Sequence, residues 1–164
     1  MVAAAIDMTR VAEQKRAWEA AAAVLDPEVP AVTVEDLGIL RSVEIDDDGV
    51  AVAKVTPTYS GCPAVLAIEL AIEAALLDAG FNPKIERVIS PAWTTDWMSD
   101  TARSKLEEFG IAPPAHSSCK NQSIRCPRCA TGNVALLSEY GSTACKSMYR
   151  CGECAETFCY FKQI

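Results

Sequence analysis

The chain contains a single histidine, His116, among its 164 residues, and it has no Glu-x-x-His pair. A carboxylate-bridged di-iron centre needs such pairs, so the sequence excludes that class of active site within this chain. A glycine-rich dinucleotide fingerprint is also missing. No apolar run reaches the roughly 18 residues of a membrane span, because segment 17–24 contains Glu19 and is followed by Asp26. Asp7 precedes any hydrophobic stretch, so we expect no secretory signal, a cytoplasmic location and no membrane partner.

Charge is distributed unevenly along the chain. Residues 1–115 carry nine Lys and Arg against nineteen Asp and Glu, whereas residues 116–164 carry six against three. The acidic part would repel phosphate, so we expect no nucleic-acid partner. A composition of 50% hydrophobic and 23% charged residues is typical of a soluble globular protein, here one ordinary domain with a small appendix.

Cysteine is the residue type that points most directly to chemistry. Without an export signal, clustered thiols bind metal more often than they form disulfides. Four of the eight cysteines form two C-x2-C pairs with 21 residues between them, which predicts a tetrahedral metal site. Zinc in a structural role is the first expectation, and a single iron ion is the alternative that spacing leaves open. The predicted ligands are Cys126, Cys129, Cys151 and Cys154.

Hydrophobic periodicity and turn signals predict an α+β fold for residues 1–115, with a small mixed sheet packed with helices, and a β-rich ribbon for residues 116–164. The linker is expected at Pro113-Pro114, where the sign of the charge changes. Helices are expected over residues 9–25, 63–79 and 99–109, and strands over 40–45, 50–55 and 84–89, the first two strands joined by the hairpin turn 46–49.

Cys62 marks a second candidate site, at the end of the second predicted strand. Pro63 is suited to open the following helix, which makes Cys62 a candidate N-cap. A thiol there would feel the positive end of the helix dipole, which favours the thiolate as a nucleophile or metal ligand. A buried thiol that fills a tight turn is the equally weighted alternative. Trp93 and Trp97 flank three polar residues further along the chain, and a core position is favoured for both. Alternatively, this segment could cover the turn that carries Cys62.

Several segments carry a resemblance to known families. Asp26 to Pro30, Val34 to Ile39, Thr56 to Pro63 and Trp93 to Trp97 resemble the iron–sulfur assembly domain, once classed as a domain of unknown function. The segments that resemble the D-subunit family of the phenylacetyl-CoA epoxidase system are Cys126 to Cys129, Gly141 to Lys146, Arg150 to Cys154 and Phe158 to Lys162. The combination extends from about Asp26 to the end of the ribbon and is more specific than either half.

This resemblance implies an accessory subunit of aerobic phenylacetate degradation with no active site of its own. Such a subunit would help to assemble an iron–sulfur or iron centre in another epoxidase subunit, especially the iron–sulfur reductase. The resemblance further implies that Cys62 carries iron or a cluster transiently, with Asp36 and Thr58 as pocket neighbours. Cys145, in a segment that resembles the family, is a possible additional ligand or reactive thiol, while Cys119 and Cys159 are expected to be incidental.

Two other functions stay open from the sequence. A thiol enzyme with Cys62 as nucleophile would need a base, and His116 is the one histidine available. Its place beside the proline linker favours a solvated surface position. The other alternative is a structural docking component of the oxygenase complex that transfers no metal.

Overall fold

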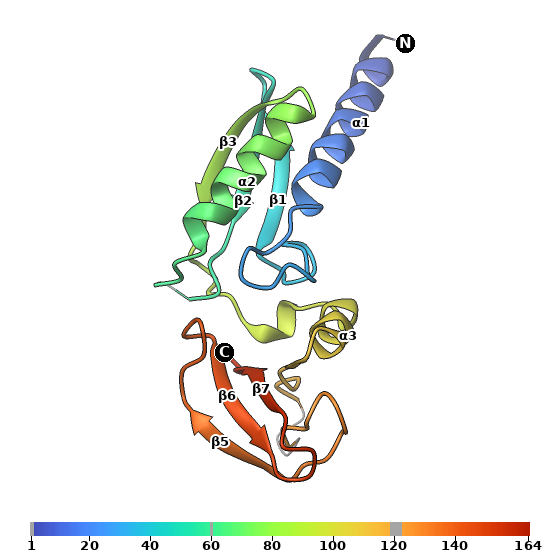
Figure 1. Cartoon of the computed structure of the whole chain (residues 1–164). Helices are drawn as coiled ribbons and strands as arrows, with labels where there is room; N and C mark the ends of the chain where they lie inside the picture. The colour runs from blue at the N-terminus through green and yellow to red at the C-terminus, as the bar shows by residue number, and fades with distance from the viewer. Residues whose placement is uncertain (1, 60, 119–122) are drawn as a thin grey trace.

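A computed structural model describes residues 2–59, 61–118 and 123–164 of the chain. Two small sheets lie toward opposite ends of an elongated molecule, with helix α3 (Asp100–Glu108) between them (Figure 1). The expected α+β architecture is confirmed. Among the described residues, no helix is both long enough and apolar enough to cross a membrane.

The first sheet is mixed, as expected. Strands β1 (Leu40–Ile45) and β2 (Val50–Val55) pair antiparallel, and β3 (Asn82–Arg87) pairs parallel to β2. The bounds of the first two strands match the prediction. Asp46 stabilises the turn between them, because its Oδ1 accepts hydrogen bonds from the amides of Asp48 and Val50.

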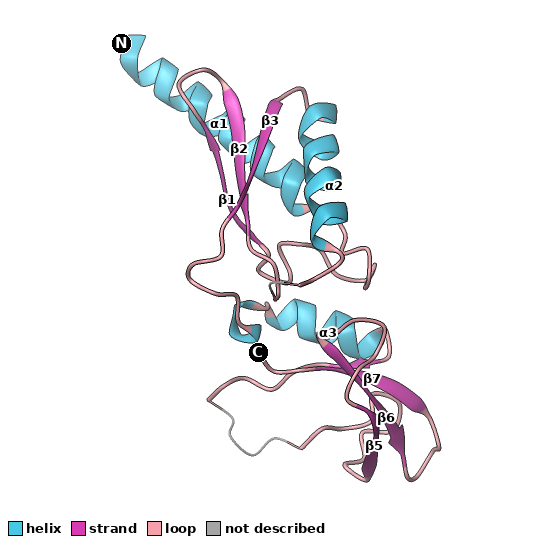
Figure 2. Ribbon diagram, turned by 90° about the vertical axis from the view of Figure 1, so that its left-hand side faces the viewer, coloured by secondary structure: helices cyan, strands magenta, loops and turns pink. Residues whose placement is uncertain are grey.

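Helices α1 (Val2–Ala22) and α2 (Val65–Asp78) contact each other and pack on this sheet, α1 against β1 and α2 against β3 (Figure 2). Helix α2 buries the four apolar residues whose spacing predicted it, and the alternate residues of β2 are buried as well. Helix α1 starts earlier and ends earlier than expected. The buried positions of α2 are Val65, Ile68, Ile72 and Leu76.

The third strand lies two residues earlier than expected, over Asn82–Arg87, and includes Pro83. Because β3 is an edge strand, one side of its backbone needs no ladder partner and proline is tolerated there. A short 3-10 helix, η1 (Thr95–Trp97), then leads to α3, whose N-cap Ser99 accepts from the Ala102 amide at 2.9 Å.

The second sheet has the strand order β4-β7-β6-β5. Its first strand, β4 (Ile111–Ala112), comes from before residue 116, where we set the start of the ribbon, and pairs parallel to β7 (Thr157–Phe161). The remaining strands are β5 (Val134–Ser138) and β6 (Lys146–Cys151), which complete an antiparallel ribbon.

The two sheets share a hydrophobic core. Cys145 and Phe161 of the ribbon belong to the same buried cluster as the residues of the first sheet and its helices. The carbonyl of Ile164 accepts hydrogen bonds from the amide and the hydroxyl of Thr95, so the C-terminal end is tied to η1. The ribbon therefore packs on the first unit through buried side chains.

Candidate functional site

Four sulfurs converge where the two C-x2-C pairs of the ribbon face each other. The Sγ atoms of Cys126 and Cys154 lie 3.7 Å apart, those of Cys129 and Cys151 lie 3.5 Å apart, and all four lie within 4.8 Å of one another. Sulfurs bound at about 2.3 Å to a tetrahedral ion are roughly 3.8 Å apart. The cluster therefore has the size of a four-thiolate metal site, and its all-sulfur donor set fits zinc or iron.

The backbone around this cluster repeats itself. Each C-x2-C pair is followed by an alanine, Ala130 or Ala155, and both have φ 59°, in the left-handed region. The amides of Glu153 and Cys154 both point at Cys151 Sγ, at 3.4 Å. Amides directed at a sulfur stabilise negative charge on it, as a metal-binding thiolate requires.

Hydrogen bonds, burial and neighbouring sulfurs shift the pKa values of Cys151 and Cys129 in opposite directions. The Cys154 amide, against the effect of burial, brings the pKa of Cys151 down to about 7. The Thr131 amide lowers the pKa of Cys129, but desolvation and the neighbouring sulfurs outweigh it and raise that pKa to about 12. The two thiols interact across their 3.5 Å contact, so without a metal they lose their protons as a coupled pair.

Cys62 lies on a turn before α2 and does not cap it. The N-cap of α2 is Ala64, so the prediction of Cys62 as N-cap and Pro63 as first helical residue is wrong. The Cys62 amide donates to the Tyr59 carbonyl at 3.2 Å, and the Cys62 carbonyl accepts from the Val65 amide at 3.4 Å. These two successive turns use the backbone of Cys62 before the helix begins.

The half-buried Cys62 lines a pocket that both units build. Thr58, expected as its neighbour, lies in the same wall, and most of the remaining wall is apolar. The ribbon closes the pocket with side chains from the loop before β6, from the start of β6 and from the end of β7. These ribbon residues are Thr143, Cys145, Lys146 and Phe161.

Charged groups are buried in this pocket. Lys146 keeps only 4% of its side chain exposed, and its Nζ lies 3.7 Å from Oε2 of Glu28. Asp26 accepts hydrogen bonds from the amides of Glu28 and Val29, both at 2.8 Å. Burial raises the pKa of Asp26 even though these amides and Lys146 lower it. The sequence did not predict Lys146 and Asp26 at this site, because no local sequence pattern indicates that the ribbon packs against the Cys62 turn.

Trp93 takes the core position that the sequence favours, whereas Asp36 lies away from the pocket where it was expected. Trp93 is buried, donates from Nε1 to the Leu37 carbonyl at 2.9 Å and packs 6.2 Å from the ring of Phe161. It belongs to the core, and Phe161 takes the pocket position that we considered for the tryptophan segment. Asp36 does not line the pocket either, since it turns toward Lys105 of α3.

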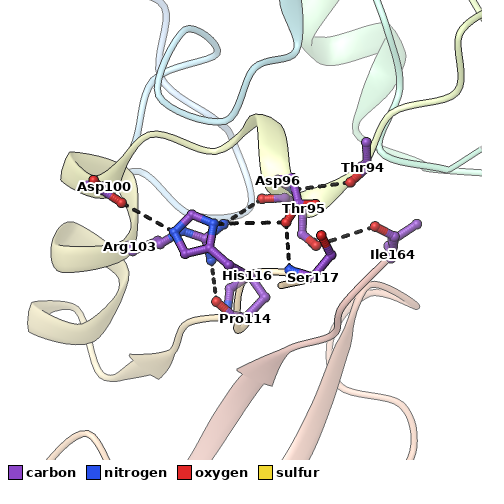
Figure 3. A network of polar contacts seen from close by, with 9 residues as sticks. All are labelled: Thr94, Thr95, Asp96, Asp100, Arg103, Pro114, His116, Ser117 and Ile164. Carbon is purple, nitrogen blue, oxygen red and sulfur yellow. Dashed lines mark hydrogen bonds and ion pairs between the residues drawn. The ribbon is translucent and has the colours of Figure 1, made fainter. Parts of the chain in front are cut away.

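His116 belongs to a separate polar network (Figure 3). Its Nε2 lies 3.5 Å from Asp100 and its Nδ1 3.9 Å from Asp96, and Arg103 lies beside the ring and donates to the Pro114 carbonyl. His116 does not line the Cys62 pocket. The base that a thiol enzyme needs is therefore not supplied by this histidine.

The other two cysteines carry little further information. Cys119 lies outside the described residues. Cys159 is half-buried in β7 and packs against the core.

Comparison with known proteins agrees with both halves of this structure. Residues 14–82 match the family model of the iron–sulfur cluster assembly protein, and residues 111–162 match the PaaD zinc beta ribbon domain. A protein of Escherichia coli (strain K12), provisionally named the D component of 1,2-phenylacetyl-CoA epoxidase, is 47% identical over 90% of this chain and 91% of its own length. The chain belongs to this PaaD family of epoxidase components. The four-cysteine group lies within the residues that match the PaaD zinc ribbon, and its geometry could hold a metal ion.

Shorter relatives match about half of this PaaD-family chain. An Fe-S protein maturation auxiliary factor, SufT, of Staphylococcus aureus (strain USA300) is 33% identical over 51% of this chain and 96% of its own length. A similar factor, YitW, of Bacillus subtilis (strain 168) is 34% identical over 51% of this chain and 82% of its own. The crystal structure of a domain of unknown function, DUF59, from Bacillus anthracis superposes with a TM-score of 0.55 at 27% identity, over 61% of this chain and 96% of that one.

Proposed function

We propose that the chain is an accessory maturation subunit of the phenylacetyl-CoA 1,2-epoxidase system in aerobic phenylacetate catabolism. It works in the cytoplasm, holds Zn²⁺ structurally through the four ribbon cysteines, and passes iron or an iron–sulfur cluster to another subunit, especially the iron–sulfur reductase. Among the described residues, the ribbon supplies the one group of three or more clustered metal-ligand side chains. In this proposal the chain acts on its cargo as a carrier, without an active site of its own.

The observation that carries this proposal is the position of Cys62. Its thiol lies within residues 14–82, which match the iron–sulfur cluster assembly model, and lines a mostly apolar pocket that the ribbon closes. Shorter relatives of the chain are named as Fe-S protein maturation auxiliary factors. A half-buried thiol outside a closed site binds a metal and releases it more readily than four thiolates do. On binding, the thiol gives up its proton to solvent, and on release the partner's ligand replaces the thiolate on the metal.

Deletion of the chain tests the proposal. Cells without it should still make the reductase and oxygenase polypeptides, but these should be poorly loaded with iron, and growth on phenylacetate should fail. Zinc-loaded Cys62→Ser protein should not restore the loading, whereas Cys159→Ser protein should. Fully metallated and active epoxidase from the deletion strain contradicts the proposal.

A docking role without metal transfer is the second candidate, and one surface favours it. Helix α2 exposes Leu66, Leu70 and Leu77, each by more than half, on the side away from its buried residues. An exposed apolar row on a helix is a common protein-binding surface. If docking is the whole function, Leu70→Glu abolishes co-purification with the other epoxidase components while Cys62→Ser leaves iron loading and growth intact.

A further inference from the structure

We infer that Cys62 and Cys145 together form a binding site for a single ferrous ion, built between the two units of the chain. This inference rests on the proposed function and makes it more specific. Cys62 comes from the turn before α2 and Cys145 from the loop before β6, and both line the same interdomain pocket. The ribbon would then supply the second thiolate in addition to holding zinc.

The loop that carries Cys145 is fixed in place. Thr143 Oγ1 lies 3.0 Å from Cys145 Sγ, and the Lys162 amide donates to the Cys145 carbonyl at 2.8 Å. The Lys146 amide donates to the Thr143 carbonyl at 3.1 Å. Since Cys145 is also part of the shared core, its sulfur is held against the first unit. A ligand positioned in this way needs little reorganisation to bind a metal.

A buried polar atom in the same pocket has no partner. Thr56 is only 2% exposed, lines the pocket, and its Oγ1 makes no hydrogen bond within the described part of the chain. Buried hydroxyls are almost always hydrogen-bonded, and leaving one unpaired costs about 1–3 kcal/mol. A metal-bound water beside the two thiols would supply the missing partner. Thr56 therefore points to a ligand independently of the cysteines.

The charges in the pocket favour a divalent cation held by thiolates. Two thiolates neutralise Fe²⁺, so the bound ion adds no net charge to a pocket whose wall is mostly apolar and already holds Asp26, Glu28 and Lys146. Lys146 is already paired with Glu28, so its ammonium is not a free site for an anionic ligand. Thiolate ligands also prefer iron to magnesium or calcium.

The size of the cavity favours one ion over a cluster. About 30 Å³ of this partly open pocket is accessible to water-sized groups, and one water molecule needs roughly 10–15 Å³, so the pocket has room for an ion and one or two small ligands. Two protein thiolates also leave coordination positions open, unlike the four ribbon cysteines. An acceptor protein can enter those positions, which is what transfer requires.

Anaerobic titration of the full, zinc-loaded chain with Fe²⁺ tests this site. We expect the wild-type protein to bind one ferrous ion beyond its zinc, with Cys62→Ser and Cys145→Ser each weakening that binding at least ~10-fold. Cys159→Ser is the matched control and should bind as the wild type does. Zinc content and the circular dichroism spectrum of each variant establish that it is folded, and Cys145→Ala replaces Cys145→Ser if the serine variant is not.

The outcomes separate this inference from the proposed function. Wild-type Fe²⁺ affinity in folded Cys145→Ser or Cys145→Ala protein overturns the two-thiol site, whether or not Cys62 is required for iron loading of the epoxidase. Conversely, a deletion strain with fully metallated epoxidase removes the proposed function, while a ferrous ion that requires both thiols still establishes the site.

Discussion

Lys105 donates from its Nζ to Oδ2 of Asp36 at 2.6 Å, which joins helix α3 to the first unit across 69 residues of sequence. The Thr33 amide donates to the same oxygen at 3.1 Å, and the Ser99 amide donates to the Asp36 carbonyl at 2.9 Å. Burial alone would raise the pKa of Asp36, but Lys105 and Thr33 lower it overall. Asp36 thus positions α3, which lies between the two sheets.

Asp36→Asn should therefore lower the free energy of unfolding at neutral pH. We expect a loss of about 1–2 kcal/mol, toward the lower end because Lys105 is partly exposed. A carboxylate with a lowered pKa stabilises the fold above the unfolded-state pKa and loses this effect as the pH falls through its folded value. Urea denaturation at pH 7 and at pH 3 should show the difference between variant and wild type shrinking in acid. An equal difference at both values would contradict this role.

The alanine that follows each C-x2-C pair is a position where glycine should stabilise the folded protein. Ala130 and Ala155 adopt φ 59°, which costs a residue with a Cβ about 1–2 kcal/mol. Ala130→Gly and Ala155→Gly should each raise the free energy of unfolding of the zinc-loaded protein by about 1 kcal/mol. Guanidinium denaturation with zinc release as the signal measures this. Ala135→Gly, in strand β5, is the control and should destabilise the protein; a uniform effect of all three substitutions would exclude backbone strain as the cause.

Loss of one ribbon thiol should disrupt the metal site and also lower the stability of the first unit. Cys126→Ser should reduce zinc from about one equivalent to less than half, because a three-thiolate remnant binds far more weakly. Since Cys145 and Phe161 pack in the shared core, the first unit should also lose stability. Limited proteolysis should cut within residues 123–164 first and then reach the first unit. Unchanged protease resistance in the variant would show that metal does not hold the ribbon.

Cys62 and Cys145 should differ in their reaction with iodoacetamide. Burial raises the pKa of Cys145, against the effects of Thr143 and Lys146, so a smaller fraction of this thiol is ionised at pH 8 than of an ordinary cysteine. Cys145 is also buried, whereas Cys62 is half-buried. Peptide mapping by mass spectrometry should show Cys62 modified at least several-fold faster in the native protein, with the two rates converging in denaturant. Equal native rates would mean that the ribbon loop does not cover Cys145.

Local patterns in the sequence predicted the elements but not how the units dock. The spacing of Val65, Ile68, Ile72 and Leu76 predicted α2, the Asp46 turn predicted the first hairpin, and the C-x2-C spacing predicted a sulfur cluster whose geometry the structure now shows. These features depend on neighbours a few residues apart or on a known ligand spacing.

The interdomain pocket depends on contacts that no local pattern encodes. Cys62 and Cys145 are 83 positions apart, and their shared pocket depends on how the ribbon loop enters the core of the first unit. Asp36 was expected at the pocket because its segment resembles the iron–sulfur assembly domain. Its carboxylate instead accepts a hydrogen bond from Lys105 of α3. The N-cap assignment of Cys62 failed for a local reason, because two consecutive turns precede the helix.

The iron content of the epoxidase reductase, produced together with this chain or with its variants, tests the central claim most directly. The account predicts full loading with the wild-type chain and with Cys159→Ser, and at least a several-fold loss of iron with zinc-loaded Cys62→Ser, at equal amounts of reductase polypeptide. Equal iron in the reductase from all three strains would contradict transfer through Cys62.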